Sequence, residues 1–560
     1  MGARAPRHAP DAIVDRIEQG EGEYRIFSQR GASGHEANPF LALCEKSATE
    51  FSGEVWAVSL VYSGSFEALS YVNNTENSRL SIGLNPDVFT WKLEPGETFV
   101  SPEAAMVYSP DGLNGMSHAF HRLYSENLMR SKWFERDRPI LINNWEATYF
   151  NFNEEKILQI ARRAKELGVE MIYTTPLFLS DTSHRYNTFD YFKIDPLLGT
   201  EDDLRELCDE LHKNGMRIVL DGVFNHSGLR FAPFVDAMEK GEASPYYGWF
   251  CFDERMPHGY HTFGDWKYMP KLNLRNPGCA QYFLEVGRYW LEKCHIDGWR
   301  LDVSPEVWPD FWRQYKKMMR EVNPDSLMIA ECWDDSRQWL STGDMFHSTM
   351  SYVWSRNVWN RFCYRKISLR EFDAVNNRSL MLYPEPVTQV LWNFLDTHDT
   401  ARVRTRAGGS VEMQRAAAFF QFTFPGSPIL YYGDELAMEG ADDPFCRFPM
   451  PWERVKYSDM HRYYRCLAEI RREHPVLRYG SFRTWQVQED GLYAYLRVAG
   501  GETVLCVLNI SDKPVHGLLP LPESMAEQSA LNELMHSSSV AVRAGCLQVA
   551  LRPGEGLIFC

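Results

Sequence analysis

The sequence lacks several features that mark specialised classes of protein. No apolar run of about 18 residues could cross a membrane, and the first residues lack the apolar core of a secretion signal. The twelve cysteines are scattered singly from Cys44 to Cys560, without the close pairs of a zinc site or the dense spacing of a disulfide scaffold. We therefore expect a cytoplasmic protein with free thiols, no membrane partner and no bound zinc.

A basic surface is also missing. The 59 Lys and Arg residues are outnumbered by 75 Asp and Glu, the net charge is -16, and no long basic stripe occurs. This balance excludes nucleic acid as an expected partner. The chain is 44% hydrophobic and 24% charged without low-complexity tracts, as folded proteins are. Its 560 residues are more than one core uses, so we expect several domains.

The N-terminal part is predicted to be rich in β-strands. Residues 54–108 alternate apolar and polar side chains between Gly, Asn and Pro, a pattern typical of half-exposed antiparallel strands. A helical stretch follows over residues 116–129. We assign residues 1–137 to a domain that contains part of a β-sandwich.

From residue 138 the pattern changes to short apolar strands that are each followed by an amphipathic helix, the first of these over residues 153–168. The expected strands lie at residues 140–143, 171–175, 217–221, 298–302, 328–331, 348–353, 390–396 and 428–432. Eight such units favour a closed (β/α)8 TIM barrel over residues 138–478. A doubly wound sheet is disfavoured because no glycine-rich phosphate loop follows the first strand.

Two segments do not follow the barrel pattern. Residues 227–270 are aromatic and irregular, and about 45 residues are more than a plain connection needs, which predicts a small inserted domain after the third strand. After residue 479 the chain returns to alternating segments such as LYAYLRV and TVLCVLNI. We expect a C-terminal antiparallel β-sandwich over residues 479–560.

Polar residues follow several of the predicted barrel strands, and such strand ends converge on one open face of a barrel. The acids and the histidine in these positions are Asp221, Asp302, Glu331, His398 and Asp399. Taken singly, each could be an ordinary strand-end residue that caps the next helix. Arg300, two residues before Asp302, and His226, close to Asp221, make the whole set typical of a catalytic site.

Hydrolysis of a glycosidic bond needs one carboxylic acid to protonate the leaving oxygen and one carboxylate to meet the sugar carbon. Neighbouring parallel strands lie about 4.8 Å apart, so Asp302 and Glu331 can reach the spacing of about 5 to 5.5 Å that a retaining mechanism uses. Arg300 can keep Asp302 ionised and oriented. The sequence therefore predicts a retaining glycoside hydrolase.

Four segments resemble the signature segments of the α-amylase family, glycoside hydrolase family 13: DGVFNH (221–226), GWRLDV (298–303), ECWDD (331–335) and FLDTHD (394–399). The resemblance extends from about residue 169 to the C-terminus. MPKLN (269–273) is similar to the neopullulanase and cyclomaltodextrinase branch. The resemblance implies a TIM barrel that cleaves α-1,4-glucosidic bonds in maltooligosaccharides, cyclodextrins or related α-glucans, with some transglycosylation.

Matched position by position, the resemblance makes Asp302 the nucleophile, Glu331 the general acid/base and Asp399 the residue that holds sugar hydroxyls. The residues implied to bind substrate are Tyr186, Asp221, His226, Arg300, Trp333 and His398. Tyr186 would stack on the sugar ring and Trp333 would flank the leaving group, although plain packing remains an alternative for both aromatic residues.

The chain departs from that branch at a few positions. Val303-Ser304-Pro305-Glu306 follows the nucleophile where the branch usually has Ala-Asn before the Glu, Asp334 replaces a common His, and Asn187 a common Asp. These changes affect the expected acceptor specificity. The family implies no required cofactor, allows calcium near Asn225, and allows a homo-oligomer.

The N-terminal part resembles a different family. Residues 36–68 and 138–171 are similar to family 36 α-galactosidases, but the second strand continues as IYTTPLFLS instead of that family's Asp-Asp-Gly-Trp. The two resemblances meet near Met171 and predict a chimera whose first barrel strand and helix serve as structure. Two alternatives remain: α-galactosidase activity from the N-terminal part, and a catalytically weak carbohydrate-binding chimera.

Overall fold

The computed structural model describes residues 18–33, 37–75, 77–128, 138–144, 159, 162–340 and 343–560. The chain divides into two compact units. The first comprises Met1–Arg130, Asp335–Asp344 and Met381–Val387, and the second comprises the remainder. Among the helices of the described ranges, none is both long and apolar enough to cross a membrane.

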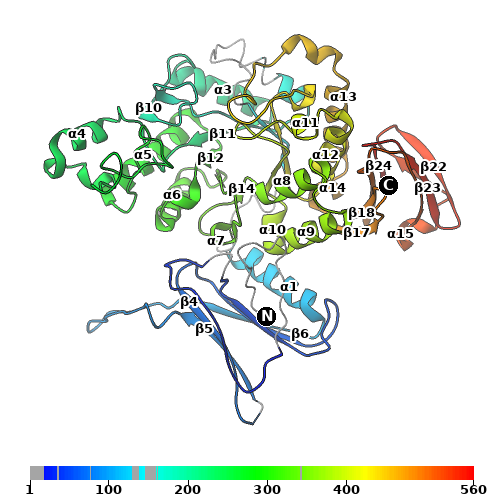
Figure 1. The fold of residues 1–560 in the computed structure, drawn as a ribbon, viewed down its shortest axis with the longest axis horizontal. Coiled ribbons are helices and arrows are strands. Elements are labelled where there is room, and N and C mark those ends of the chain that lie inside the picture. The colour runs from blue at the N-terminus through cyan, green and yellow to red at the C-terminus, as the bar shows by residue number, and fades with distance from the viewer. Residues whose placement is uncertain are drawn as a thin grey trace. The chain divides into compact units, whose positions relative to one another are not determined.

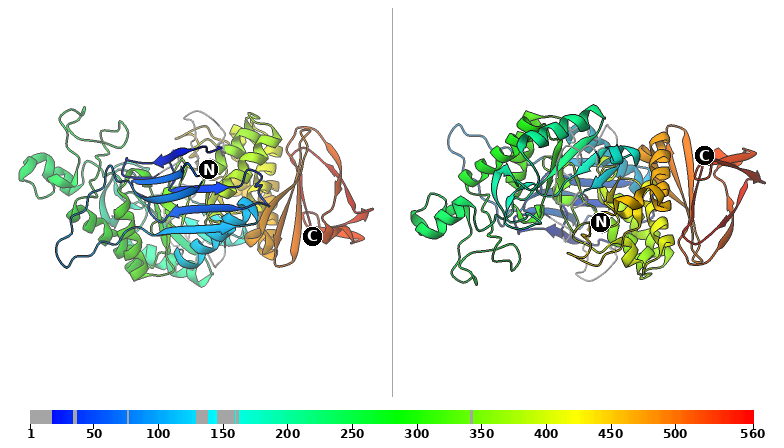
Figure 2. Two further views of the ribbon diagram at one scale, coloured as in Figure 1. Left: turned by 90° about the horizontal axis from the view of Figure 1, so that it is seen from below. Right: turned by 90° about the horizontal axis from the view of Figure 1, so that it is seen from above.

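The first unit contains two three-stranded antiparallel sheets and short helical segments, which confirms the predicted β-rich character (Figure 2). The strand orders are β1-β4-β5 and β2-β3-β6. The elements are β1 (Gly22–Phe27), β2 (Phe40–Cys44), β3 (Val55–Leu60), β4 (Phe66–Val72), β5 (Ser78–Leu84), β6 (Ala104–Ser109), α1 (Gly112–Leu123) and α7 (Arg337–Leu340). The helix predicted at 116–129 begins at Gly112 and continues as a π-helical turn over Tyr124–Leu128.

The first unit buries few side chains between its sheets. Its inter-sheet core consists of Leu41, Val58, Leu60, Phe66 and Ala68. On the same face as Val58, the side chains of Trp56, Met106 and Tyr108 remain 37%, 69% and 51% exposed. Trp56 and Tyr108 are paired across β3 and β6, with ring centroids 5.3 Å apart. The sheet β1-β4-β5 therefore covers only part of the sheet β2-β3-β6.

The second unit contains an eight-stranded parallel barrel. Its strands are β7 (Leu141–Asn143), β8 (Met171–Tyr173), β11 (Arg217–Gly222), β12 (Gly298–Leu301), β13 (Leu327–Ala330), β14 (Ser348–Thr349), β15 (Trp392–Phe394) and β16 (Ser427–Tyr431). Their order is β14-β13-β12-β11-β8-β7-β16-β15, and a parallel bridge between Met350 and Trp392 joins the two ends. All eight predicted barrel strands are confirmed.

Helices surround the barrel (Figure 1). They are α3 (Glu201–Lys213), α5 (Pro277–Cys294), α6 (Pro309–Val322), α8 (Tyr352–Val358), α9 (Leu369–Leu382), α11 (Val403–Arg406), α12 (Val411–Thr423), α13 (Asp459–Glu473) and α14 (Val476–Tyr479), while α10 (Glu385–Thr388) belongs mostly to the first unit. Thr200 and Asp203 form a capping box at the start of α3, and the Asn276 side chain caps α5. Most of the helix predicted over 153–168 lies outside the described residues, but residues 162–166 are helical.

Two irregular segments extend the loops of the barrel. A hairpin of β9 (Phe178–Ser180) and β10 (Thr188–Ile194) follows β8. The predicted insert at 227–270 contains α4 (Ala232–Lys240), two short 3-10 turns and isolated bridges, and Figure 2 shows that the α4 region projects from the barrel. Phe234 packs against Phe250 and Tyr260 at ring distances of 4.9 and 5.1 Å, so aromatic contacts stabilise this segment.

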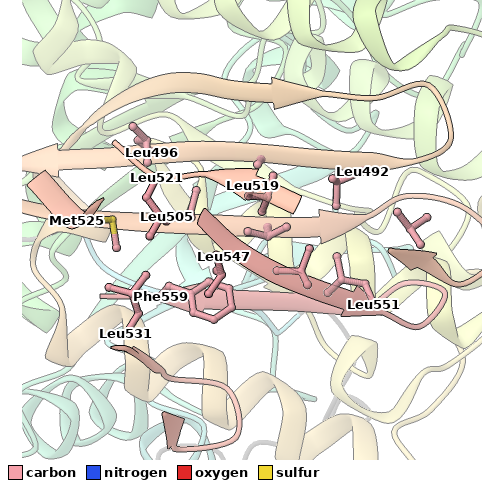
Figure 3. Packing of buried hydrophobic residues seen from close by; sticks show 14 residues of the cluster. Leu492, Leu496, Leu505, Leu519, Leu521, Met525, Leu531, Leu547, Leu551 and Phe559 are labelled. Carbon is pink, nitrogen blue, oxygen red and sulfur yellow. The ribbon is translucent and has the colours of Figure 1, made fainter. Parts of the chain in front are cut away.

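The C-terminal part forms one antiparallel sheet that folds over its own core. Its elements are β17 (Ser481–Val487), β18 (Leu492–Ala499), β19 (Glu502–Asn509), β20 (Val515–Pro520), α15 (Glu523–Ala526), β21 (Ala530–Glu533), β22 (Ser538–Arg543), β23 (Cys546–Leu551) and β24 (Gly556–Phe559). Figure 3 shows side chains of this core between the strands, among them Leu505 of β19 and Leu547 of β23. The predicted C-terminal β-domain is confirmed.

Candidate active site

The ends of β11, β12 and β13 bring three carboxyl groups around one guanidinium. Arg300 on β12 is in register with Asp221 on β11. Its Nη1 atom lies 2.9 Å from Asp221 Oδ1 and 2.9 Å from Asp302 Oδ1, and Nη2 lies 3.0 Å from Glu331 Oε1. All four side chains are buried. Because an unpaired charge is costly away from water, each group depends on the others for its ionised form.

Asp302 and Glu331 lie on the two terminal nitrogens of the same guanidinium, and each affects the pKa of the other. Burial and the Glu331 charge raise the pKa of Asp302 well above its usual value, against the opposing effect of Arg300. Burial acts in the same direction on Glu331, but Arg300, the Val303 N–H and Trp333 together hold its pKa below the usual value. The two carboxyl groups therefore titrate together and not independently.

A second network joins Asp221 to the residues that follow β15. Asp221 Oδ2 accepts hydrogen bonds from the Tyr173 hydroxyl at 2.5 Å and the Tyr186 hydroxyl at 3.1 Å. His398 Nε2 lies 2.8 Å from the Tyr186 hydroxyl and 3.1 Å from Asp399 Oδ2. Burial, reinforced by Arg300 and Arg447, lowers the pKa of His398 well below its usual value, so the imidazole is neutral.

Asp399 has a different environment from the other acids. Burial and the Glu331 charge raise the pKa of Asp399 to about 7, while Arg300 and Arg447 oppose the shift. Arg447 Nη2 lies 3.3 Å from Asp399 Oδ1, and Arg447 Nε donates to the His398 carbonyl at 2.8 Å. Asp399 can therefore exchange a proton near neutral pH while Arg447 holds its position.

His226 and Trp333, both predicted from the sequence, also belong to the site. His226 Nε2 donates to the Tyr186 carbonyl at 3.0 Å, its ring stacks on Phe263, and burial lowers its pKa to about 3. Trp333 Nε1 donates to Glu331 Oε1 at 3.0 Å, and its ring stacks on Tyr352 with centroids 4.2 Å apart. Trp333 is nevertheless 45% exposed, which leaves part of its ring accessible beside Glu331.

The backbone after Asp302 is strained. Val303 adopts φ 44° and ψ 43°, a left-handed conformation that is unfavourable for a β-branched residue. Its N–H donates to Glu331 Oε2 at 2.9 Å. The unusual conformation therefore places one more donor on the Glu331 carboxylate.

The nine predicted site residues form one connected set. Contacts through Arg300 join Asp221, Asp302 and Glu331, and the remaining members connect through Tyr186, His398 and Trp333. Sequence reasoning missed Asn143, Tyr173 and Arg447. Asn143 and Tyr173 end β7 and β8, so their strand-end position was the available signal. The catalytic and binding roles of the nine predicted residues remain predictions.

Metal ligands are not gathered in this region. Among the described residues, no group of three or more His, Cys, Asp or Glu side chains is placed to hold a metal ion. Asn225 Oδ1 is buried without a hydrogen-bond partner, while Asn225 Nδ2 lies 3.3 Å from His226 Nδ1.

Known families match successive parts of the chain. The family model described as alpha amylase, catalytic domain, matches residues 163–480, and the maltogenic amylase C-terminal domain matches 482–558. The glycosyl hydrolase family 36 N-terminal domain matches residues 7–94, and melibiase matches 98–223, overlapping the α-amylase match. The expected junction of two families is therefore confirmed, and β7 lies on the melibiase side.

Individual proteins give the same assignment. Neopullulanase 2 from Thermoactinomyces vulgaris is 40% identical over 404 residues, covering 70% of this chain and 68% of that protein. A cyclomaltodextrinase from a Bacillus species is 38% identical over 381 residues, covering 66% and 68%. Among solved structures, a cyclomaltodextrinase covers 96% of each chain with 26% identity and a TM-score of 0.72.

A debranching enzyme from Nostoc punctiforme is also similar in structure, with 27% identity and a TM-score of 0.67 over 77% of this chain. The α-amylase match covers more than half of the 560 residues and includes every predicted site residue. The protein belongs to the α-amylase family of glycoside hydrolases and is a glycosidase that acts on α-glucans, with an N-terminal segment of the family 36 type.

Proposed function

We propose that the protein is a retaining hydrolase of α-1,4-glucosidic bonds in cyclodextrins and short maltooligosaccharides. The observation that carries this proposal is that one guanidinium binds both acids, with Asp302 Oδ1 2.9 Å from Arg300 Nη1 and Glu331 Oε1 3.0 Å from Arg300 Nη2. An inverting mechanism needs a water molecule between sugar and base, with carboxyl groups about 6.5–9.5 Å apart. Two carboxyl groups held on one guanidinium fit the closer pair of a retaining mechanism.

The proposed reaction proceeds in two displacements. Asp302 attacks the anomeric carbon while Glu331 gives its proton to the glycosidic oxygen, which leaves as an alcohol. This step needs Asp302 ionised and Glu331 protonated, so the proton of the pair must reside on Glu331 once the glycosidic oxygen is bound. In the second step Glu331 removes a proton from water, which displaces Asp302 from the sugar. Arg300 contacts both carboxyl groups and stabilises their ionised forms throughout.

The remaining residues are proposed to hold the sugar. His398 and Asp399 lie side by side and can bind neighbouring hydroxyl groups, with Asp399 tightening its contacts as positive charge develops on the ring. The accessible part of Trp333 can stack on the leaving sugar beside Glu331. If a second sugar took the place of water in the second displacement, the reaction would be transglycosylation. The similarity to a neopullulanase and a cyclomaltodextrinase supports the choice of substrates.

Product analysis tests this function. The purified protein should release reducing sugar from cyclodextrins and maltotriose, and proton NMR should detect the α-anomer first. Asp302→Asn and Glu331→Gln should each lower kcat at least about 1,000-fold, because each removes one of the two groups of the reaction. Asp310→Asn and Glu321→Gln, at exposed positions on α6, serve as matched controls. First release of the β-anomer would contradict the retaining mechanism.

The melibiase match over residues 98–223 motivates a second candidate, α-galactosidase activity. Hydrolysis of a nitrophenyl α-galactoside that survives Asp302→Asn would favour it. The third candidate, a catalytically weak carbohydrate-binding chimera, predicts tight maltooligosaccharide binding by calorimetry with no product. A combined assay on cyclodextrin, maltotriose, pullulan and melibiose separates all three.

We further propose that the enzyme needs no cofactor. Dialysis against EDTA should leave kcat/KM on maltotriose unchanged. A loss that calcium reverses would instead point to a calcium site that includes the Asn225 oxygen.

The partner and location are also proposals. Exposed apolar side chains of the first unit, including Trp56 and Met106, support contact between copies of the chain, which light scattering would test. Similarity to an intracellular maltogenic amylase of Bacillus subtilis, at 36% identity, supports a cytoplasmic location. Fractionation of the producing cells would test it.

A further inference from the structure

We propose that Asn143, at the end of the first barrel strand, is a positioning residue that fixes the tautomer of His398 and thereby places its single ring proton on Nε2, which faces the Tyr186 hydroxyl and Asp399. This inference rests on the proposed roles of His398 and Asp399. It also gives the family 36-like strand a part in the chemistry, whereas the sequence predicted that this strand serves only as structure.

The location of Asn143 follows from the register of β7. This strand lies between β8 and β16, where Asn143 pairs with Tyr173 on one side and Tyr431 on the other. The side chain is 1% exposed, and its Nδ2 atom lies 3.2 Å from His398 Nδ1. The two residues are 255 positions apart in the chain, so closure of the barrel brings them together.

The chemistry of the two groups decides where the imidazole proton resides. An amide nitrogen of Asn can only donate a hydrogen bond, so His398 Nδ1 must be the unprotonated acceptor. The neutral ring then carries its proton on Nε2. The opposite tautomer would set two donors against each other at Nδ1 and two acceptors against each other at Asp399 Oδ2, 3.1 Å from Nε2.

The same choice sets the direction of a longer hydrogen-bond chain. Asn143 donates to His398, His398 Nε2–H donates to the Tyr186 hydroxyl at 2.8 Å, and that hydroxyl donates to Asp221 Oδ2 at 3.1 Å. Asp221 in turn contacts Arg300. Because His398 has a single ring proton and Tyr186 a single hydroxyl proton, a change of tautomer at His398 would disturb the partners of the Asp221 carboxylate.

The tautomer matters because the surroundings keep His398 neutral. The charged or titratable groups that face the ring or its partners are Tyr173, Tyr186, Asp221, Arg300, Asp399 and Arg447. Arg300 and Arg447 disfavour a positive imidazolium, as does burial. With protonation suppressed, the position of the single ring proton determines whether Nε2 donates to a hydroxyl group or accepts from one.

Two substitutions of Asn143 test this role. Asn143→Ala removes the donor and lets both tautomers form, so kcat should fall about 10- to 100-fold with little change in KM. Asn143→Asp instead accepts a proton from Nδ1 and favours either the wrong tautomer or the doubly protonated ring. Its kcat should be partly recovered at low pH, where both ring nitrogens carry protons, and lost as pH rises through the raised pKa of His398.

The matched control is Asn393→Ala. Asn393 is also buried on a barrel strand, but its amide donates to the Pro425 carbonyl, so its loss should lower Tm without changing kcat or the pH profile of folded enzyme. Asn143→Ala introduces no charge and carries the test if Asn143→Asp fails to fold. Unchanged kcat in folded Asn143→Ala would overturn the inference, even with Asp302→Asn inactive. A pH profile of Asn143→Asp that matches the wild type would also overturn it.

Discussion

At the mouth of the barrel, buried charged side chains are packed together, whereas the C-terminal domain is built around a cluster of fourteen buried hydrophobic side chains. Arg300 and three carboxyl groups are packed together in the first region. The second consists of residues such as Leu505, Leu547 and Phe559, drawn from most of its strands. Burial of charge costs stability that burial of hydrocarbon supplies, so the C-terminal core can be expected to stabilise the fold while the barrel mouth performs the reaction.

Arg300 lies in the barrel mouth, but its replacement should affect both stability and catalysis. Arg300→Leu leaves three buried carboxyl groups without their cation, which should destabilise the barrel by about 3–5 kcal/mol and abolish activity. Chemical denaturation followed by tryptophan fluorescence measures the first effect, and sugar release measures the second. Arg300→Lys, which retains a charge, is the control and should fold better than Arg300→Leu. Wild-type stability in Arg300→Leu would show that the carboxyl groups do not need their cation.

Leu505→Ala, in the C-terminal core, should lower stability without affecting catalysis. The side chain of Leu505 is fully buried in the C-terminal core, so truncation should cost about 2–5 kcal/mol through lost burial and a cavity. The kcat of the folded variant should stay within about twofold of the wild type, because this core is built from residues between Leu492 and Phe559 and includes no catalytic residue. Calorimetry and steady-state kinetics on the same sample provide the two values. The exposed Leu518→Ala is the matched control.

Asp399→Asn should raise stability while it removes activity. The folded protein raises the pKa of Asp399 from 3.8 to about 7, so it binds this proton more tightly than the unfolded chain does. The resulting stabilisation is complete below about pH 4 and is lost as pH rises through about 7. Asn therefore should give a Tm gain of about 2–4 °C at pH 8 that disappears towards pH 4. An equal gain in Tm at pH 4 and at pH 8 would contradict the raised pKa of Asp399.

The smallest effect is expected in the first unit. Replacing Trp56 and Tyr108 by Thr changes two partly exposed side chains that are paired across strands, so stability should change by less than about 0.5 kcal/mol. If these residues mediate contact between copies, light scattering should report a lower mass. An unchanged mass would place any such contact elsewhere. Trp56 and Tyr108 would then belong to a third region of the molecule, which contributes little to stability and takes no part in catalysis.

The sequence predicted the barrel well because its strands are short apolar runs separated by amphipathic helices. The same regularity placed Asp302 and Glu331 at strand ends that must converge. It could not predict which further side chains would contact the site residues. Asn143 and Arg447 reach His398 and Asp399 through contacts that depend on loop paths and barrel closure. The strained conformation of Val303 likewise has no signal in the residue type, since valine avoids that region.

The first unit was predicted less completely. Residues 54–108 gave the alternation of β3 to β6, but β1 and β2 precede that stretch and were not singled out. The exposure of Trp56 could not be foreseen, because it depends on how far the opposite sheet extends. A pattern of alternation indicates which side chains share a face, but it does not tell what covers that face.

The position of Arg300 between three strands also has a consequence for the order of events during folding. Its guanidinium meets Asp221, Asp302 and Glu331 only when β11, β12 and β13 are side by side and in register. Helices can form earlier from local contacts, but they cannot assemble this group. During refolding, catalytic competence should therefore return late, together with the pairing of these three strands, and lag behind the recovery of helical circular dichroism.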